Sequence, residues 1–113
     1  MAASAGSRRV TLPRLFVYGT LQNDSVVQEL LGHRLFGRAA VLKDFYRTLD
    51  PTIGYHVIRP QEGASVAGTV LDGIDEKSLA ILDEYEGSQY RRIVVQVHTV
   101  EGRVLDAYVY VPA

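Results

Sequence analysis

The pattern of apolar and polar positions divides the chain into short strands and two helices, beginning with an apolar run at residues 15–18. This run is β-branched and aromatic, which is typical of a strand buried on both faces. It stops at Gly19, Thr20 and Leu21. A glycine at such a corner lets a ligand approach the main chain, so that successive amide groups can converge on one anion. An ordinary exit from a strand into a loop explains the same residues.

Five further segments carry the β-branched and aromatic composition of strands. Gly68 lies inside the third of them and suggests a bulge or a close approach of another backbone. The second and third are predicted to pair with each other, and Glu101-Gly102 is predicted to turn the last two into a hairpin. Between residues 43 and 63, glycines and prolines predict a loop-rich middle segment. The five segments cover residues 35–41, 55–59, 66–71, 92–99 and 103–111.

Two segments have helical spacing. In the first, Ser25 and Gln28 form a candidate capping box, Gly32 is the stop, and the buried face is supplied by two valines and two leucines. The second covers Asp75–Tyr85, with Asp75 as the candidate N-cap and Gly87 as the left-handed residue beyond its end.

About six strands and two helices, in an order that does not alternate strand with helix, indicate the α+β class. We expect a mostly antiparallel sheet that curls into a small mixed barrel with two flanking helices. At 113 residues the chain is long enough for one domain. Residues 1–11 are predicted to be a disordered tail and residues 12–113 a single domain.

Composition narrows the range of functions. A net charge of −1 gives no electrostatic reason to expect nucleic acid or a membrane surface as a partner. There is no cysteine, no signal peptide and no apolar run of about 18 residues, so we expect a cytoplasmic protein. We also expect a monomer. His33, His56 and His98 lack ligand spacing, and the nucleotide-binding and serine-hydrolase motifs are missing, so we expect neither a metal nor a cofactor.

Glu86 lies on an unusual face of the second predicted helix. At about 100° per residue, its position falls between those of Leu79 and Leu82, which face the core, whereas Glu84 falls on the solvent side. Burial and the carbonyl end of the helix dipole both raise the pKa of such a carboxylate. Glu86 is therefore a candidate general acid or base. The alternative is a structural glutamate that pairs with a following arginine or turns outward at a frayed helix end.

Two tyrosines, Tyr108 and Tyr110, alternate along the last predicted strand and therefore share one of its faces. Packing in the core is the simpler interpretation, and a role in the wall of a pocket is the alternative.

Three blocks of sequence together resemble the γ-glutamylcyclotransferase family, and more narrowly its AIG2-like and γ-glutamylamine cyclotransferase branch. The resemblance extends from Arg14 to about Val111 and departs from the family pattern at His56. The blocks are Phe16-Val17-Tyr18-Gly19-Thr20-Leu21, Val66-Ala67-Gly68-Thr69-Val70, and Leu82-Asp83-Glu84-Tyr85-Glu86-Gly87 followed by Tyr90-Arg91-Arg92.

The resemblance implies an enzyme that cyclises the γ-glutamyl group of a γ-glutamyl amine or amide to 5-oxoproline and releases the free amine. It implies that the Tyr18–Leu21 segment binds the glutamyl moiety, that Glu86 is the general acid and base, and that residues 46–63 line the far end of the substrate. The substrate carries its own nucleophile, so this reaction needs no metal or cofactor. Tyr90 and Arg92 are interpreted as structural or charge-pairing residues. The alternative function is a non-catalytic module that binds a small carboxylate or amino acid.

Overall fold

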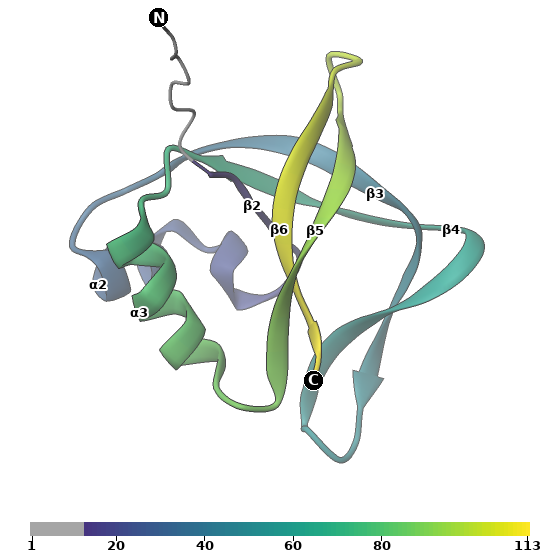
Figure 1. Cartoon of the computed structure of the whole chain (residues 1–113), viewed down its shortest axis with the longest axis horizontal. Coiled ribbons are helices and arrows are strands. Elements are labelled where there is room, and N and C mark those ends of the chain that lie inside the picture. Colours follow the sequence, from purple (N-terminus) through teal and green to yellow (C-terminus); the bar gives the residue numbers. More distant parts are fainter. Residues whose placement is uncertain (1–12) are drawn as a thin grey trace, which may run out of the picture.

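The computed structural model describes residues 13–113, which form a barrel with two helices packed on one side (Figure 1). The predicted tail at residues 1–11 lies outside the described residues. The strands are β2 (Leu15–Val17), β3 (Phe36–Asp50), β4 (Tyr55–Asp72), β5 (Tyr90–Thr99) and β6 (Val104–Pro112), the helices are α2 (Asp24–Leu31) and α3 (Glu76–Glu86), and η1 (Thr20–Gln22) is a single 3₁₀ turn.

The strands close in the order β2-β4-β3-β5-β6. All neighbouring pairs are antiparallel except β2 and β6, which pair in parallel where Leu15 lies opposite Tyr108. The predicted α+β class and the mixed, mostly antiparallel barrel with two flanking helices are therefore confirmed. The hairpin of β5 and β6 is also confirmed, with Gly102 in its turn at φ 91°.

The prediction of about six strands was too high, because residues 55–59 and 66–71 belong to the single long strand β4. They pair with β3 rather than with each other. The segment predicted to be loop-rich is therefore mostly a hairpin, with its turn at residues 51–54. Pro60 and Gly63, which also favoured a loop, lie where the pairing of β3 with β4 is irregular. At this point Asp44 has φ 66°, and its carboxylate accepts a hydrogen bond from the Gly63 amide (3.0 Å).

Strand β2 is buried on both faces, as predicted, and its alternating side chains enter two different cores. Phe16 and Tyr18 pack with residues from all the other strands, which fill the barrel. Leu15 and Val17 pack outside the barrel against residues of α2 and α3. The four residues from Leu15 to Tyr18, three of them in β2, thus connect the barrel to the helices.

The helix ends are set by hydrogen bonds that the sequence predicted in part. For α3 the Asp75 cap is confirmed, since its side chain accepts a hydrogen bond from the Ser78 amide (2.8 Å). For α2 the predicted capping box is wrong, because Asn23 is the N-cap and Ser25 already lies within the helix. Gly32 ends α2, as predicted, and its backbone lies in the left-handed region. Within residues 13–113 neither helix has the length and apolar character needed to span a membrane.

Gly68 on β4 lies in close contact with β2, which confirms the predicted approach of another backbone. A Cβ atom there would lie 2.7 Å from Cζ of Phe16 and would collide with the carbonyl oxygen of Val17. At Gly19, by contrast, a Cβ would meet no atom within 4 Å.

We therefore expect Gly68→Ala to lower the free energy of unfolding by about 1–3 kcal/mol or more, because β2 must move away from its partner. Gly19→Ala is the matched control and should change it by less than about 1 kcal/mol. Urea denaturation of both variants measures the difference. Equal stabilities would contradict the close approach of β2 to β4.

Candidate functional site

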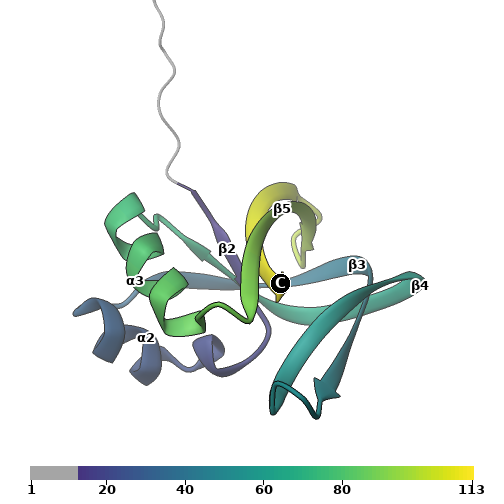
Figure 2. The same ribbon diagram turned by 60° about the horizontal axis from the view of Figure 1, so that its bottom comes forward.

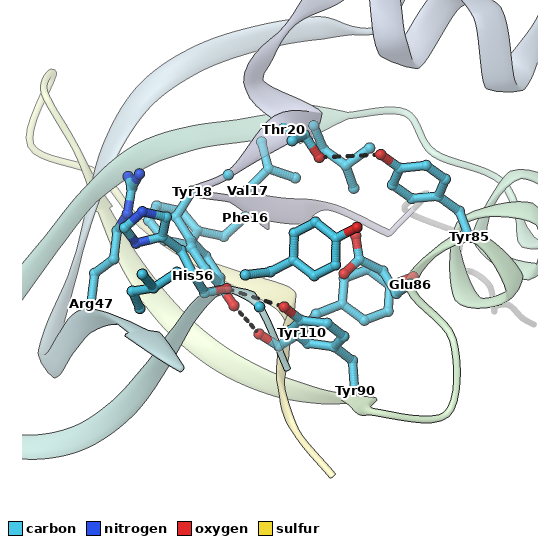
Figure 3. Close-up of a pocket in the computed structure, with 15 residues that line it drawn as sticks. Phe16, Val17, Tyr18, Thr20, Arg47, His56, Tyr85, Glu86, Tyr90 and Tyr110 are labelled. Atoms are coloured by element: carbon cyan, nitrogen blue, oxygen red, sulfur yellow. Dashed lines mark hydrogen bonds between the residues drawn. The ribbon is translucent and has the colours of Figure 1, made fainter. Parts of the chain in front are cut away.

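A cavity of about 550 Å³ opens where β2 ends, between the C-terminal end of α3 and the turn of the β3–β4 hairpin. The turned view in Figure 2 shows this hairpin projecting away from the two helices. Side chains from these elements enclose the space in Figure 3. The lining residues are Phe16, Val17, Tyr18, Gly19, Thr20, Leu21, Arg47, Leu49, Gly54, Tyr55, His56, Tyr85, Glu86, Tyr90 and Tyr110.

All four residues of the predicted binding segment, Tyr18–Leu21, line this cavity. The Tyr18 side chain is buried, and its hydroxyl donates a hydrogen bond to the Tyr110 carbonyl (2.8 Å). Gly19 has φ −124°, outside the left-handed region, so a positive φ is not the reason for glycine here. What the glycine provides is open space beside the main chain, which is the property expected from the sequence.

Glu86 is the last residue of α3 and lines the same cavity, while Glu84 is exposed to solvent, as the helical wheel predicted. Burial raises the pKa of the Glu86 carboxyl from 4.5 to about 7. Within the described residues this carboxylate makes no hydrogen bond or ion pair, so the alternative of a salt bridge to Arg91 or Arg92 is not observed. It is a half-buried carboxyl group that titrates near neutral pH.

Arg92 pairs with Asp83 instead. Its guanidinium donates two hydrogen bonds to the Asp83 carboxylate (2.8 and 3.0 Å), and the Tyr110 hydroxyl donates a third (2.7 Å). The Arg92 bond is the largest cause holding the pKa of Asp83 below its ordinary value. Because Asp83 lies one turn before Glu86, these bonds attach the last turn of α3 to β5 and β6. The pairing interpretation of Arg92 agrees with this geometry.

The structure separates the three remaining tyrosines of the predicted site. Tyr110 lines the cavity, whereas Tyr108 does not: its ring lies under the Arg92 guanidinium, 4.5 Å from the charge. Tyr108 lies two residues before Tyr110 on β6, which places it about 7 Å farther from the cavity. The pocket-wall alternative therefore fails for Tyr108. Tyr90, interpreted as structural, also lines the cavity and donates a hydrogen bond to the His56 carbonyl (3.1 Å).

Several lining residues were not singled out from the sequence. Tyr85 precedes Glu86, and its hydroxyl shares a hydrogen bond with that of Thr20 (3.3 Å, Figure 3). The others lie on the β3–β4 hairpin, in the segment that the resemblance assigned to the far end of the substrate. Apart from His56, where the chain departs from the family pattern, the residues of that hairpin were not identified from the sequence. Their position depends on the pairing of β3 with β4, which the glycines and prolines of this segment did not indicate. Among the described residues, no cluster of His, Asp or Glu side chains could hold a metal ion.

Comparison with known proteins identifies the family. The family model described as gamma-glutamyl cyclotransferase, AIG2-like, matches residues 15–113. The chain belongs to this family. AIG2-like protein D of Arabidopsis thaliana is 41% identical over 91 residues, which cover 80% of the chain and 60% of that relative. A Methanocaldococcus jannaschii protein named as a gamma-glutamylcyclotransferase and putative RNase is 33% identical over 101 residues, 85% of the chain and 44% of that relative. The chain thus spans less than two thirds of either relative.

Solved structures confirm the AIG2-like fold. A solution structure of an Arabidopsis thaliana protein superposes with a TM-score of 0.83 at 28% identity, covering 96% of the chain and 73% of that protein. A crystal structure of a mouse AIG2-like protein gives a TM-score of 0.77 at 26% identity, covering 92% of the chain and 79% of that protein. The barrel with flanking helices is therefore the architecture of the family.

The raised pKa of Glu86 predicts a pH-dependent cost in stability. Between pH 4.5 and about 7 the unfolded chain loses the Glu86 proton while the folded protein keeps it, so folding stability falls as the pH rises through this window. Glu86→Gln removes this cost. We expect the variant to gain stability relative to the wild type from pH 4 to pH 8, by about 1–2 kcal/mol, because one pKa unit corresponds to about 1.4 kcal/mol and solvent at this partly exposed group screens part of the cost.

Urea denaturation at pH 4 and pH 8 measures this change. Glu84→Gln is the matched control because Glu84 is exposed on the opposite side of the same helix turn. The interpretation is wrong if Glu86→Gln and the wild type show the same pH dependence.

Proposed function

We propose that this chain is an enzyme that cyclises the γ-glutamyl group of a γ-glutamyl amine or amide to 5-oxoproline and releases the free amine. The observation that carries the proposal is that Glu86, with a pKa near 7, opens into the same cavity as the Tyr18–Leu21 segment. Membership of the γ-glutamyl cyclotransferase, AIG2-like family supports it.

The chemistry needs only a base and a means of holding the substrate. The α-nitrogen of the glutamyl group attacks its own γ-carbonyl, forming the ring C–N bond, and the bond from the γ-carbon to the leaving nitrogen breaks. Glu86 accepts the proton that the α-ammonium must lose and returns it to the leaving nitrogen, so the carboxylate is regenerated. The ring nitrogen loses its second proton as the lactam forms, and this proton passes to the released amine, which departs as an ammonium ion. A group with a pKa near 7 suits both transfers at neutral pH.

The Tyr18–Leu21 segment supplies the means of holding the substrate. Gly19 leaves its main chain accessible, and the amides of Gly19, Thr20 and Leu21 are the donors we assign to the α-carboxylate or to the oxyanion that forms at the γ-carbon. Tyr18 and Tyr110 form a wall whose position is fixed by the hydrogen bond between them. This wall would limit the glutamyl chain to conformations in which the amine can reach the carbonyl.

The direct test is to follow 5-oxoproline by NMR after adding γ-glutamyl-ε-lysine and a panel of other γ-glutamyl amides. We expect turnover of at least one, and we expect kcat/KM to rise with pH through about 7 as Glu86 loses its proton. Glu86→Gln should lower kcat by about 10²–10⁴-fold, the usual contribution of a general acid or base.

Glu84→Gln serves as the control here too and should keep wild-type activity. Full activity of Glu86→Gln would exclude the mechanism. Chemical shift changes around Gly19–Leu21 without any product over hours would favour the alternative of a non-catalytic module that binds a small carboxylate or amino acid.

A further inference from the structure

The end of α3 that carries Glu86 is attached to the rest of the site on two sides. Asp83 attaches it to β5 and β6 through the hydrogen bonds described above. Tyr85 attaches it to η1, because its hydroxyl shares a hydrogen bond with the Thr20 hydroxyl (3.3 Å). The proposed cyclisation gives this second attachment no role.

The two attachments lie on either side of Glu86 around the helix axis. At about 100° per residue, Asp83 falls about 60° to one side of Glu86 and Tyr85 about 100° to the other. Figure 3 shows the Tyr85 side chain turned toward Thr20, whereas Glu86 turns toward the tyrosines of the cavity. A rotation of the helix end that carries the carboxylate away from the cavity therefore strains one of the two attachments.

The partner of Tyr85 belongs to the segment that we assign to the substrate. In η1 the side chain of Leu21 is buried in the same core as the leucines of α3, which fixes the inner side of the turn. Thr20 is exposed, and its bond to Tyr85 is the only side-chain hydrogen bond between η1 and α3 within residues 13–113. This bond therefore connects the proposed anion-binding amides to the residue beside the proposed base.

We propose that Tyr85 is a positioning residue: its hydroxyl, bound to Thr20, holds the Glu86 carboxylate and the amides of the Tyr18–Leu21 segment in the arrangement that one substrate molecule can contact at both ends. This inference rests on the proposed cyclisation. If the base and the anion donors moved independently, many arrangements would bind the substrate but few would bring its amine to its own carbonyl. A link between them excludes the unproductive arrangements, so its effect falls on kcat.

Tyr85→Phe tests the inference because it keeps the ring and removes only the hydroxyl. We expect kcat for a γ-glutamyl amide that the wild type cyclises to fall by about 3–10-fold, the effect of one hydrogen bond between neutral groups, while KM stays within about twofold. Thr20→Val removes the partner hydroxyl and should lower kcat by a similar factor. The double variant should be no slower than the slower single variant, because both changes remove the same bond.

The pKa of Glu86 is a second measurement, and it needs no turnover. Burial raises this pKa to about 7, so a helix end that is released on one side should expose the carboxylate to more water and lower its pKa toward 4.5. We expect NMR of the carboxyl carbon as a function of pH to show a fall of about 0.5–1 in Tyr85→Phe and in Thr20→Val. Both variants keep the other ionisable side chains of the cavity, which are Tyr18, Arg47, Tyr55, His56, Tyr90 and Tyr110.

Thr69→Val is the matched control. The Thr69 hydroxyl donates a hydrogen bond to Gln22 of the same η1 turn (3.4 Å), but it lies on β4 and makes no bond to α3. This variant should leave the pKa of Glu86 unchanged and kcat within about twofold of the wild type.

Three outcomes would decide against the inference or separate it from the proposed reaction. If Tyr85→Phe behaves like Thr69→Val, the inference is wrong although the cyclisation stands. If Tyr85→Phe raises KM and leaves kcat and the pKa of Glu86 unchanged, the hydroxyl binds the substrate directly and the inference is again wrong. If no γ-glutamyl compound is turned over but the pKa of Glu86 falls as expected, the cyclisation fails while Tyr85 still positions the carboxylate.

Discussion

The closure of the barrel by β2 is the constraint on which the rest of the structure depends. This strand has only three residues, yet it pairs with β4 on one side and β6 on the other, and its side chains enter both cores. Its contact with β4 is possible because Gly68 has no side chain. The chain leaves β2 through Tyr18 and Gly19, so the position of the predicted binding segment follows directly from barrel closure.

A second constraint acts on the end of α3. A carboxyl group that is half-buried without a partner destabilises the folded protein when it ionises, and a short helix end could relieve this by fraying toward water. The hydrogen bonds from Arg92 and Tyr110 to Asp83 oppose that escape, because they attach the same helical turn to two strands. A group that lowers the stability of the folded protein and is nevertheless held in place, as Glu86 is, is characteristic of functional sites.

The cavity has two chemically different ends. Near α3 it holds the titrating carboxyl of Glu86 beside buried tyrosines. Burial is the largest cause that raises the pKa of both Tyr18 and Tyr110, and for Tyr110 the hydrogen bond to Asp83 raises it further. These hydroxyls therefore stay neutral and donate their hydrogen bonds at any ordinary pH. At the hairpin the wall is exposed, cationic and apolar. The two ends of the cavity therefore differ in charge and in exposure to solvent.

The sequence by itself determined the elements whose signals are local. The apolar run of β2, the Asp75 cap, the glycine stops and the C-terminal hairpin each depend on neighbouring residues, and the inward position of Glu86 follows from helical geometry alone. The tertiary structure decided what depends on distant partners. Strand β4 extends through a proline and two glycines because β3 pairs with it, Arg92 binds Asp83 because β5 passes that helix turn, and Arg47 faces the cavity only through the hairpin register. Long-range pairing supplies hydrogen bonds and burial that override local preference, and no periodicity in the chain records them.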